Sequence, residues 1–160
     1  MDVQELLEEI TNAPVQKRAI TNHDVLNEAY CYGSAFSRGL RIDLNGLVIL
    51  LISGTASIDD QGNTVHVGEF RAQVRRTFQN ITGLLASEGA TWKDVVRTTC
   101  YLRDIERDYT AFNEERTAFY RHQGLQPLPA STGIQAILCR PDLLVEIEAI
   151  AMFRRTETKE

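Results

Sequence analysis

The order of its segments predicts that this chain folds as one α+β domain, a mixed β-sheet with two helices on one face. Three features support the prediction: a hairpin signal, two amphipathic helical patterns, and strand patterns placed between and after those helices. The chain has 160 residues and 43% apolar content, which suits a single globular domain with a buried core.

The hairpin is predicted around Asn45-Gly46, a pair that readily supplies the positive φ angles of a two-residue turn. Residues 39–43 and 46–53 flank this turn and are expected to form two antiparallel strands. The segment 53–57 then closes the second strand, and the polar residues 59–63 form a solvated turn.

Two helices and a strand follow the hairpin. Residues 70–87 carry apolar side chains three or four positions apart, which predicts an amphipathic helix that Gly89 ends. The segment 95–102 is rich in Val, Thr, Cys and Tyr and favours a strand. A second helix is expected over residues 108–122, after which Gly124 lets the chain turn away.

The last two strands are predicted over residues 130–138 and 143–153, with Pro141 between them. Strand, helix, strand sequences imply right-handed crossovers, which place both helices on the same face of the sheet. The other face then has no helix to cover its apolar side chains. We therefore expect a closed homo-oligomer that buries this face.

The first thirty residues are expected to stand apart from this domain. Residues 2–12 have the spacing of a short helix with one apolar stripe, and residues 13–29 are polar and aperiodic. The sequence thus predicts a helical extension over residues 1–29 and a main domain over residues 30–156.

Composition argues against several classes of function. The net charge of −5 gives no field that would attract nucleic acid, and the longest apolar run, residues 47–52, is too short to cross a membrane. The three cysteines, Cys31, Cys100 and Cys139, form no C-x-x-C pair, so we expect a reducing, cytoplasmic location. The three histidines are unclustered and no phosphate loop is present, so neither a metal nor an organic cofactor is expected.

The carboxy-terminal segment 140–151, R-P-D-L-L-V-E-I-E-A-I-A, resembles the closing signature of the Rid (reactive intermediate deaminase, YjgF-type) family. The segments L-I-S-G at 51–54 and D-V-V-R-T-T-C-Y-L-R-D at 94–104 are similar to other family strands, and Pro129-Ala130 introduces the penultimate one. The resemblance extends over residues 35–154.

This resemblance implies a chorismate-mutase-like fold and a homotrimer whose sheets line a central barrel, with ligand clefts between subunits. Family members hydrolyse imines and enamines of amino acids without a metal or cofactor. In them an arginine two residues after the penultimate-strand proline grips the substrate carboxylate. Here Ser131 stands in that place and Gly133 replaces a frequent cysteine, so the chain is similar to a subgroup that lacks the deaminase arginine.

Glu146 aligns with the family's cleft glutamate and is the candidate catalytic residue, a general base toward water. The alternative is that Glu146 has no catalytic role and is an exposed carboxylate on a strand. Glu148 lies on the same strand face, where it would either raise the pKa of its neighbour or be solvated. Arg38 and Phe36 share one side of an extended segment, so Arg38 is expected to bind the substrate carboxylate that Ser131 cannot bind. The alternatives are that Arg38 is a surface charge or part of an intersubunit ion pair. Arg140 is a second, loop-borne candidate.

Further candidate substrate-binding residues are Ser53, Gly54 and Thr55 at a strand end, where backbone and hydroxyl groups could hold a substrate oxygen. Gly54 could equally mark a bulge. Ser131, in the penultimate strand, is a candidate because it aligns with the family's carboxylate-binding arginine.

The leading hypothesis is metal-free hydrolysis of a small imine, enamine or related organic acid in an intersubunit cleft. The alternative is a non-catalytic trimer that binds a metabolite or a protein partner. Endoribonuclease activity, sometimes attached to the family, does not suit the acidic charge.

Overall fold

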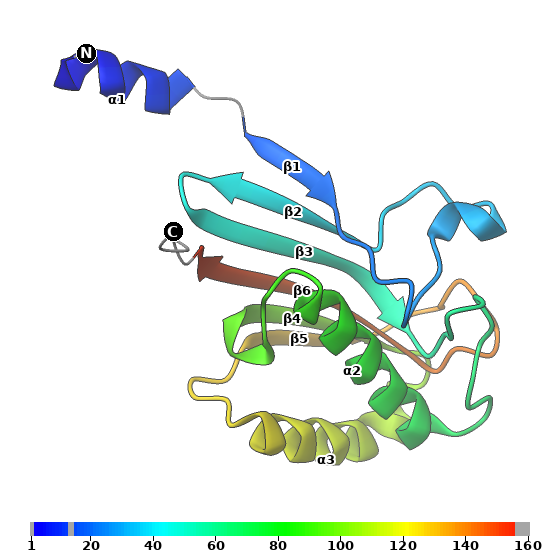
Figure 1. The fold of residues 1–160 in the computed structure, drawn as a ribbon. Coiled ribbons are helices and arrows are strands. Elements are labelled where there is room, and N and C mark those ends of the chain that lie inside the picture. Colours follow the sequence, from blue (N-terminus) through cyan, green and yellow to red (C-terminus); the bar gives the residue numbers. More distant parts are fainter. Residues whose placement is uncertain (1, 13–14, 156–160) are drawn as a thin grey trace.

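The computed structural model describes residues 2–12 and 15–155 and shows a six-stranded mixed sheet with helices (Figure 1). The strands run in the order β1-β2-β3-β6-β4-β5 across the sheet. The strands are β1 Gln16–Ala19, β2 Gly39–Leu44, β3 Leu47–Ala56, β4 Val95–Leu102, β5 Ala130–Gln135 and β6 Val145–Arg154. The helices are α1 Val3–Asn12, α2 Phe70–Ala86 and α3 Ile105–Gln123, with short 3-10 turns at Ala29–Tyr32 and Trp92–Asp94.

The predicted hairpin is confirmed, because β2 and β3 are antiparallel and Asn45 and Gly46 form the turn with φ angles of 48° and 82°. β6 then inserts between β3 and β4 and runs antiparallel to both. β3 and β4 are therefore parallel to each other and joined through α2, whereas β4 and β5 are parallel neighbours joined through α3. This order puts the last strand at the centre of the sheet.

Both long helices cover the same face of the sheet, as expected (Figure 1). The core between them centres on aromatic rings: Phe78 stacks on Phe119 at 4.5 Å, and Trp92 meets both rings edge-on. The Trp92 indole nitrogen donates to Thr82 Oγ1 at 2.8 Å, so its one polar group is satisfied where the ring is buried.

Element boundaries differ from the predictions at a few ends. α3 begins at Ile105 because the Asp104 side chain accepts a hydrogen bond from the Arg107 backbone and caps the helix. β5 ends at Gln135, three residues before the predicted end at Leu138, whose carbonyl instead accepts a hydrogen bond from Arg103.

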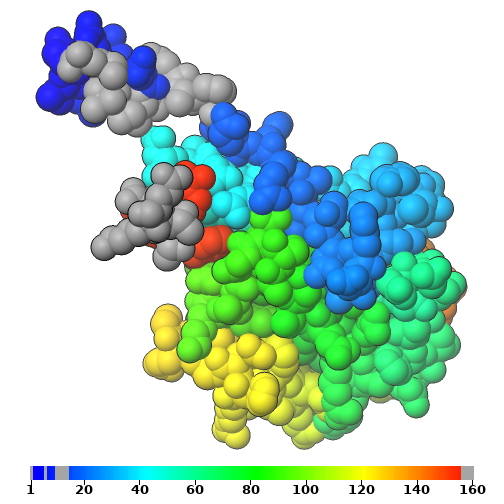
Figure 2. Space-filling model, in the orientation of Figure 1, coloured from blue at the N-terminus to red at the C-terminus, as the bar shows by residue number. Residues whose placement is uncertain are grey.

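The expectation that residues 1–29 stand outside the core is wrong for residues 16–29. β1 pairs with β2 along its whole length, and Ile20, Leu26 and Ala29 are fully or almost fully buried. Sequence periodicity missed β1 because all four of its side chains are exposed and its pairing uses the backbone. α1 does project from the body as an extension (Figures 1 and 2). Residues 13 and 14, which follow the predicted first helix, and residue 156, the predicted end of the main domain, lie outside the described residues.

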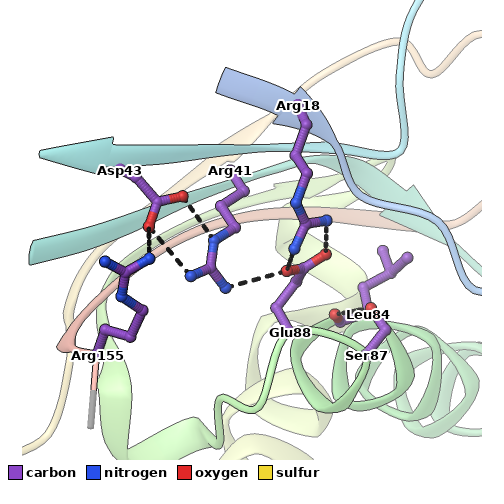
Figure 3. A network of polar contacts seen from close by, with 7 residues as sticks. All are labelled: Arg18, Arg41, Asp43, Leu84, Ser87, Glu88 and Arg155. Atoms are coloured by element: carbon purple, nitrogen blue, oxygen red, sulfur yellow. Dashed lines mark hydrogen bonds and ion pairs between the residues drawn. The ribbon is translucent and has the colours of Figure 1, made fainter. Parts of the chain in front are cut away.

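An ion network ties β1 to the end of α2 (Figure 3). Arg18 of β1 donates two hydrogen bonds to Glu88, at 2.7 and 2.6 Å, and Arg41 of β2 donates a third at 3.2 Å. Arg41 also pairs with Asp43 through two hydrogen bonds, and that arginine holds the pKa of Asp43 below its usual value. The network therefore connects β1, β2 and the helix layer.

The face of the sheet opposite the helices keeps apolar side chains exposed, among them Leu51, Ile134 and Met152. Their exposure agrees with the reasoning that predicted a closed homo-oligomer; the oligomer, and the homotrimer that the family resemblance implies, stay predictions. Within the described residues, no helix has the length and apolar character needed to cross a membrane.

Candidate functional site

A cavity of about 440 Å³ lies where β3 ends and β6 begins, and we call it the Glu146 cavity. It is lined by Tyr32, Ser34, Phe36, Arg38, Ser53, Gly54, Ala56, Ile58, Cys139, Arg140, Leu143, Glu146 and Glu148. Its walls come from four parts of the chain: the segment before β2, the end of β3, the loop before β6 and the start of β6. Five of the predicted site residues, together with Arg140 and Glu148, meet in it.

Strand alternation places the two carboxylates. Along β6 the residues Val145, Ile147 and Ala149 are buried under the helices, so Glu146 and Glu148 point to the opposite face. Both line the Glu146 cavity, and Glu148 also lines an adjacent hollow of about 540 Å³ over the uncovered face of the sheet.

A β-bulge opens β3 at this point. The register between β3 and β6 shifts between Ile52 and Thr55, so Ser53 and Gly54 together face the single residue Glu148. Because Gly54 has no side chain, the Glu146 carboxylate can lie directly against its backbone, and a Cβ there would overlap Glu146 Oε1. The bulge at Gly54 is therefore confirmed, and Gly54 lines the cavity, while its role in substrate binding stays a prediction.

The two glutamates have different environments. The Tyr101 hydroxyl donates a hydrogen bond of 2.9 Å to Glu148 Oε1. Among the described residues, no group donates a hydrogen bond to the Glu146 carboxylate. Burial raises the pKa of Glu146 above its usual value, and the nearby charge of Glu148 raises it further.

Arg38 is buried at the cavity wall. Its residue surface is only 4% exposed, and it donates to the Asn27 carbonyl at 2.8 Å and to Asn27 Oδ1 at 3.2 Å. Its guanidinium also packs over the rings of Tyr32 and Phe36. The surface-charge alternative is thus wrong, whereas an ion pair across a subunit contact is not tested.

Arg140 reaches the same cavity from the loop before β6. It donates to the Gly62 carbonyl at 2.8 Å, and its guanidinium lies 5.1 Å from the centre of the Tyr32 ring. Gln73 and Arg103 hold this loop in place through its backbone: Gln73 bonds to Asp142 and Leu144, and Arg103 bonds to the carbonyls of Leu143 and Arg140. These bonds are all between 2.6 and 2.9 Å long.

Two predicted site residues lie elsewhere. Thr55 is buried and donates its hydroxyl to the Ser53 carbonyl at 2.7 Å, so it shapes the bulge. Ser131 faces α3, where it accepts hydrogen bonds from Arg116 and Thr98 beside a separate cavity of about 370 Å³. Within one chain Ser131 and Glu146 are thus on opposite faces of the sheet. The Ser53 hydroxyl donates to the Ser37 carbonyl, which leaves its oxygen free to accept.

Sequence reasoning missed Tyr32 and Cys139 as cavity residues. Tyr32 ends a short 3-10 turn and Cys139 sits in an irregular loop, and neither segment has a periodic pattern that predicts orientation. Among the described residues, no three His, Cys, Asp or Glu side chains are grouped so as to hold a metal ion. The groups that are present suit proton transfer and anion binding.

This small mixed α+β domain belongs to a known family of proteins. Residues 33–153 match the family described as Endoribonuclease L-PSP, and the chain belongs to this family, which includes the YjgF and RutC proteins. The resemblance to the Rid family is thereby confirmed.

Individual relatives agree with this assignment. A protein of Acinetobacter baylyi named 3-aminoacrylate deaminase RutC is 33% identical over 103 residues, 64% of this chain and 78% of the relative. A RutC family protein of Pyrococcus abyssi is 29% identical over 102 residues, covering 64% and 76% of the two chains.

Solved structures show the same fold. The Rid protein YyfA from Yersinia pestis has a TM-score of 0.71 at 26% identity, with 85% of this chain and 98% of that chain covered. The YjgF gene product of E. coli has a TM-score of 0.70 at 23% identity, with 86% and 99% covered.

Proposed function

We propose that this protein hydrolyses a small imine or enamine that carries a carboxylate, and that the reaction takes place in the Glu146 cavity. The observation that supports it most is the position of the Glu146 carboxyl group against the open bulge at Gly54, in the cavity that the buried Arg38 also lines. The A. baylyi relative named for 3-aminoacrylate, an enamine of a carboxylic acid, supports the same substrate class.

Glu146 has the properties of an acid and base in one group. In its protonated form it gives a proton to the imine nitrogen, which makes the carbon electrophilic. The carboxylate that remains takes a proton from the attacking water, so that a carbinolamine forms. The same group returns that proton to the nitrogen, and as the carbon–nitrogen bond breaks the carboxylate takes the proton of the carbinolamine hydroxyl, which gives the carbonyl compound and ammonia and leaves Glu146 protonated again. Overall, one imine and one water give one carbonyl compound and one ammonia.

Arg38 holds the substrate carboxylate in this scheme. A guanidinium offers several N–H donors in a plane that matches a carboxylate, and the low exposure of Arg38 strengthens the attraction. This grip replaces the one that the family arginine supplies at the position of Ser131.

The test is ammonia release from imines made in place by an amino-acid oxidase, compared among wild type, Glu146→Gln and Arg38→Ala. Wild type should accelerate release over the uncatalysed rate, Glu146→Gln should abolish the acceleration, and Arg38→Ala should raise KM. Arg75→Ala is a matched control, because among the described residues the ion-pair partner of Arg75 is Glu115, on the helix surface away from the cavity. If wild type does not exceed the uncatalysed rate, a non-catalytic binding role becomes the better account.

A further inference from the structure

The Glu146 cavity contains two guanidinium groups that have no anionic partner. Arg38 donates only to the carbonyl and the side-chain oxygen of Asn27, and Arg140 donates only to the carbonyl of Gly62 and the hydroxyl of Thr64. Every one of these acceptors is neutral. Within the part of the chain that the structure describes, neither arginine forms an ion pair, although both line a cavity that contains two glutamates.

Burying a cation without a counter-charge raises the free energy of the folded state, so an anion that binds Arg38 would stabilise the protein. The Nε and Nη2 of Arg38 are used by Asn27, whereas Nη1 has no acceptor among the described residues. Arg38 also lies next to the bulge, because the Ser53 amide donates to its carbonyl at 3.1 Å. A carboxylate adjacent to the reacting carbon would satisfy Nη1 close to Gly54 and Glu146.

Arg140 has spare donors of its own. Gly62 and Thr64 both accept from Nη1, at 2.8 and 3.3 Å, and among the described residues Nε and Nη2 have no acceptor. Both arginines contact the Tyr32 ring, with their guanidinium carbons 5.3 Å and 5.1 Å from its centre. Arg140 is partly exposed and sits on a loop, so it lies toward the outside of the cavity from Arg38.

The two carboxylates of the cavity form no ion pair with these arginines in the part of the chain that the structure describes. Glu148 accepts a hydrogen bond from Tyr101, and burial together with the charge of Glu148 raises the pKa of Glu146. When Glu146 is protonated, the two arginines face a single negative charge. A ligand with two negative charges matches this arrangement better than a ligand with one.

We propose that the substrate is a dicarboxylate, an imine or enamine derived from an acidic amino acid such as aspartate or glutamate. Arg38 binds the carboxylate next to the reacting carbon, and Arg140 binds the distal carboxylate. This inference rests on the proposed function for its reaction, and it adds the class of substrate.

The kinetic test compares imines of glutamate and aspartate with those of their neutral amides, glutamine and asparagine. Wild type should show kcat/KM at least about tenfold higher for the acidic members, the size expected for one charged hydrogen-bonding contact. Arg140→Ala should remove this preference by raising KM for the acidic substrates, whereas Arg140→Lys should restore part of the preference. Equal kcat/KM for acidic and neutral imines in wild type would overturn the inference and leave the proposed hydrolysis standing.

A binding measurement keeps the inference testable without turnover and without relying on one variant. Glu146→Gln protein is titrated calorimetrically with the product-like 2-oxoglutarate and with 2-oxopentanoate, which has the same carbon chain but only one carboxylate. Tighter binding of 2-oxoglutarate, reduced about tenfold or more in Glu146→Gln/Arg140→Ala, supports a dicarboxylate site even if no imine is hydrolysed. Equal affinity for the two acids refutes it. A circular dichroism melt of each Arg140 variant shows whether the Gly62 loop still folds.

Discussion

Removing the Glu88 carboxylate is the sharpest test of how the amino-terminal strand is held (Figure 3). Glu88 accepts two hydrogen bonds from Arg18 and one from Arg41, and its side chain is 3% exposed. Glu88→Ala would leave the Arg41 side chain, 12% exposed, with Asp43 as its one remaining carboxylate within the network described here. It would also leave β1 without its side-chain link to α2.

The expected loss follows from the exposure of each partner. Breaking a buried ion pair on one side costs about 3–5 kcal/mol in general. Arg18 is 59% exposed and solvent screens its share, while Arg41 keeps two hydrogen bonds to Asp43. We therefore expect Glu88→Ala to lower the free energy of unfolding by about 2–3 kcal/mol, which corresponds to a fall in Tm of roughly 5–10 °C. Glu88→Gln keeps one acceptor and should lose about half as much.

Urea denaturation of wild type, Glu88→Ala and Glu88→Gln measures these differences, and hydrogen exchange shows where they act. The amides of residues 16–20 should lose protection in Glu88→Ala, because β1 detaches before the rest of the sheet. Arg75→Ala is the matched control, because it removes an ion pair of α2 whose arginine side chain is 67% exposed. The reasoning fails if Glu88→Ala destabilises the protein no more than Arg75→Ala does, or if β1 keeps its protection.

Three further changes test the site and its supports. Gly54→Ala should displace the Glu146 carboxylate and reduce kcat at least about tenfold with the Tm within a few degrees of wild type; unchanged kcat would contradict the close contact. Glu146→Gln should be more stable than wild type at neutral pH, because a carboxyl group whose pKa is raised in the folded state contributes stability at acid pH that is lost as the pH rises. The difference in the free energy of unfolding should shrink when denaturation is repeated below the ordinary pKa of glutamate. A difference that stays constant with pH would argue against the raised pKa. Asn80→Asp removes the two hydrogen bonds that the Asn80 side chain donates to the carbonyls of Ala56 and Ile58, at 2.9 and 2.8 Å. It should lower the free energy of unfolding, measured by chemical denaturation, by about 2–4 kcal/mol. A loss below about 1 kcal/mol would mean that the end of β3 does not depend on these bonds.

Local sequence patterns were sufficient for much of the fold. The Asn45-Gly46 turn, α2 and β4 lie where periodicity and turn chemistry predicted them. In each case the signal is contained in one short segment, since a buried helix face or strand face must repeat along the chain. β1 lacked such a signal, because its exposed side chains carry no pattern and it is held by backbone pairing and the Arg18–Glu88 contact.

The candidate site depended on both levels of information. The sequence by itself determined the family and named Glu146, Arg38 and Gly54 as site residues, because the motif and the strand pattern lie within short segments. Only the tertiary structure decided that Glu146 rests against Gly54, that Arg140 joins Arg38 around Tyr32, and that Ser131 faces the helices. The physical reason is that these contacts join segments far apart in the chain, and their meeting is fixed by sheet order, by the bulge in β3 and by the loop that Gln73 and Arg103 hold.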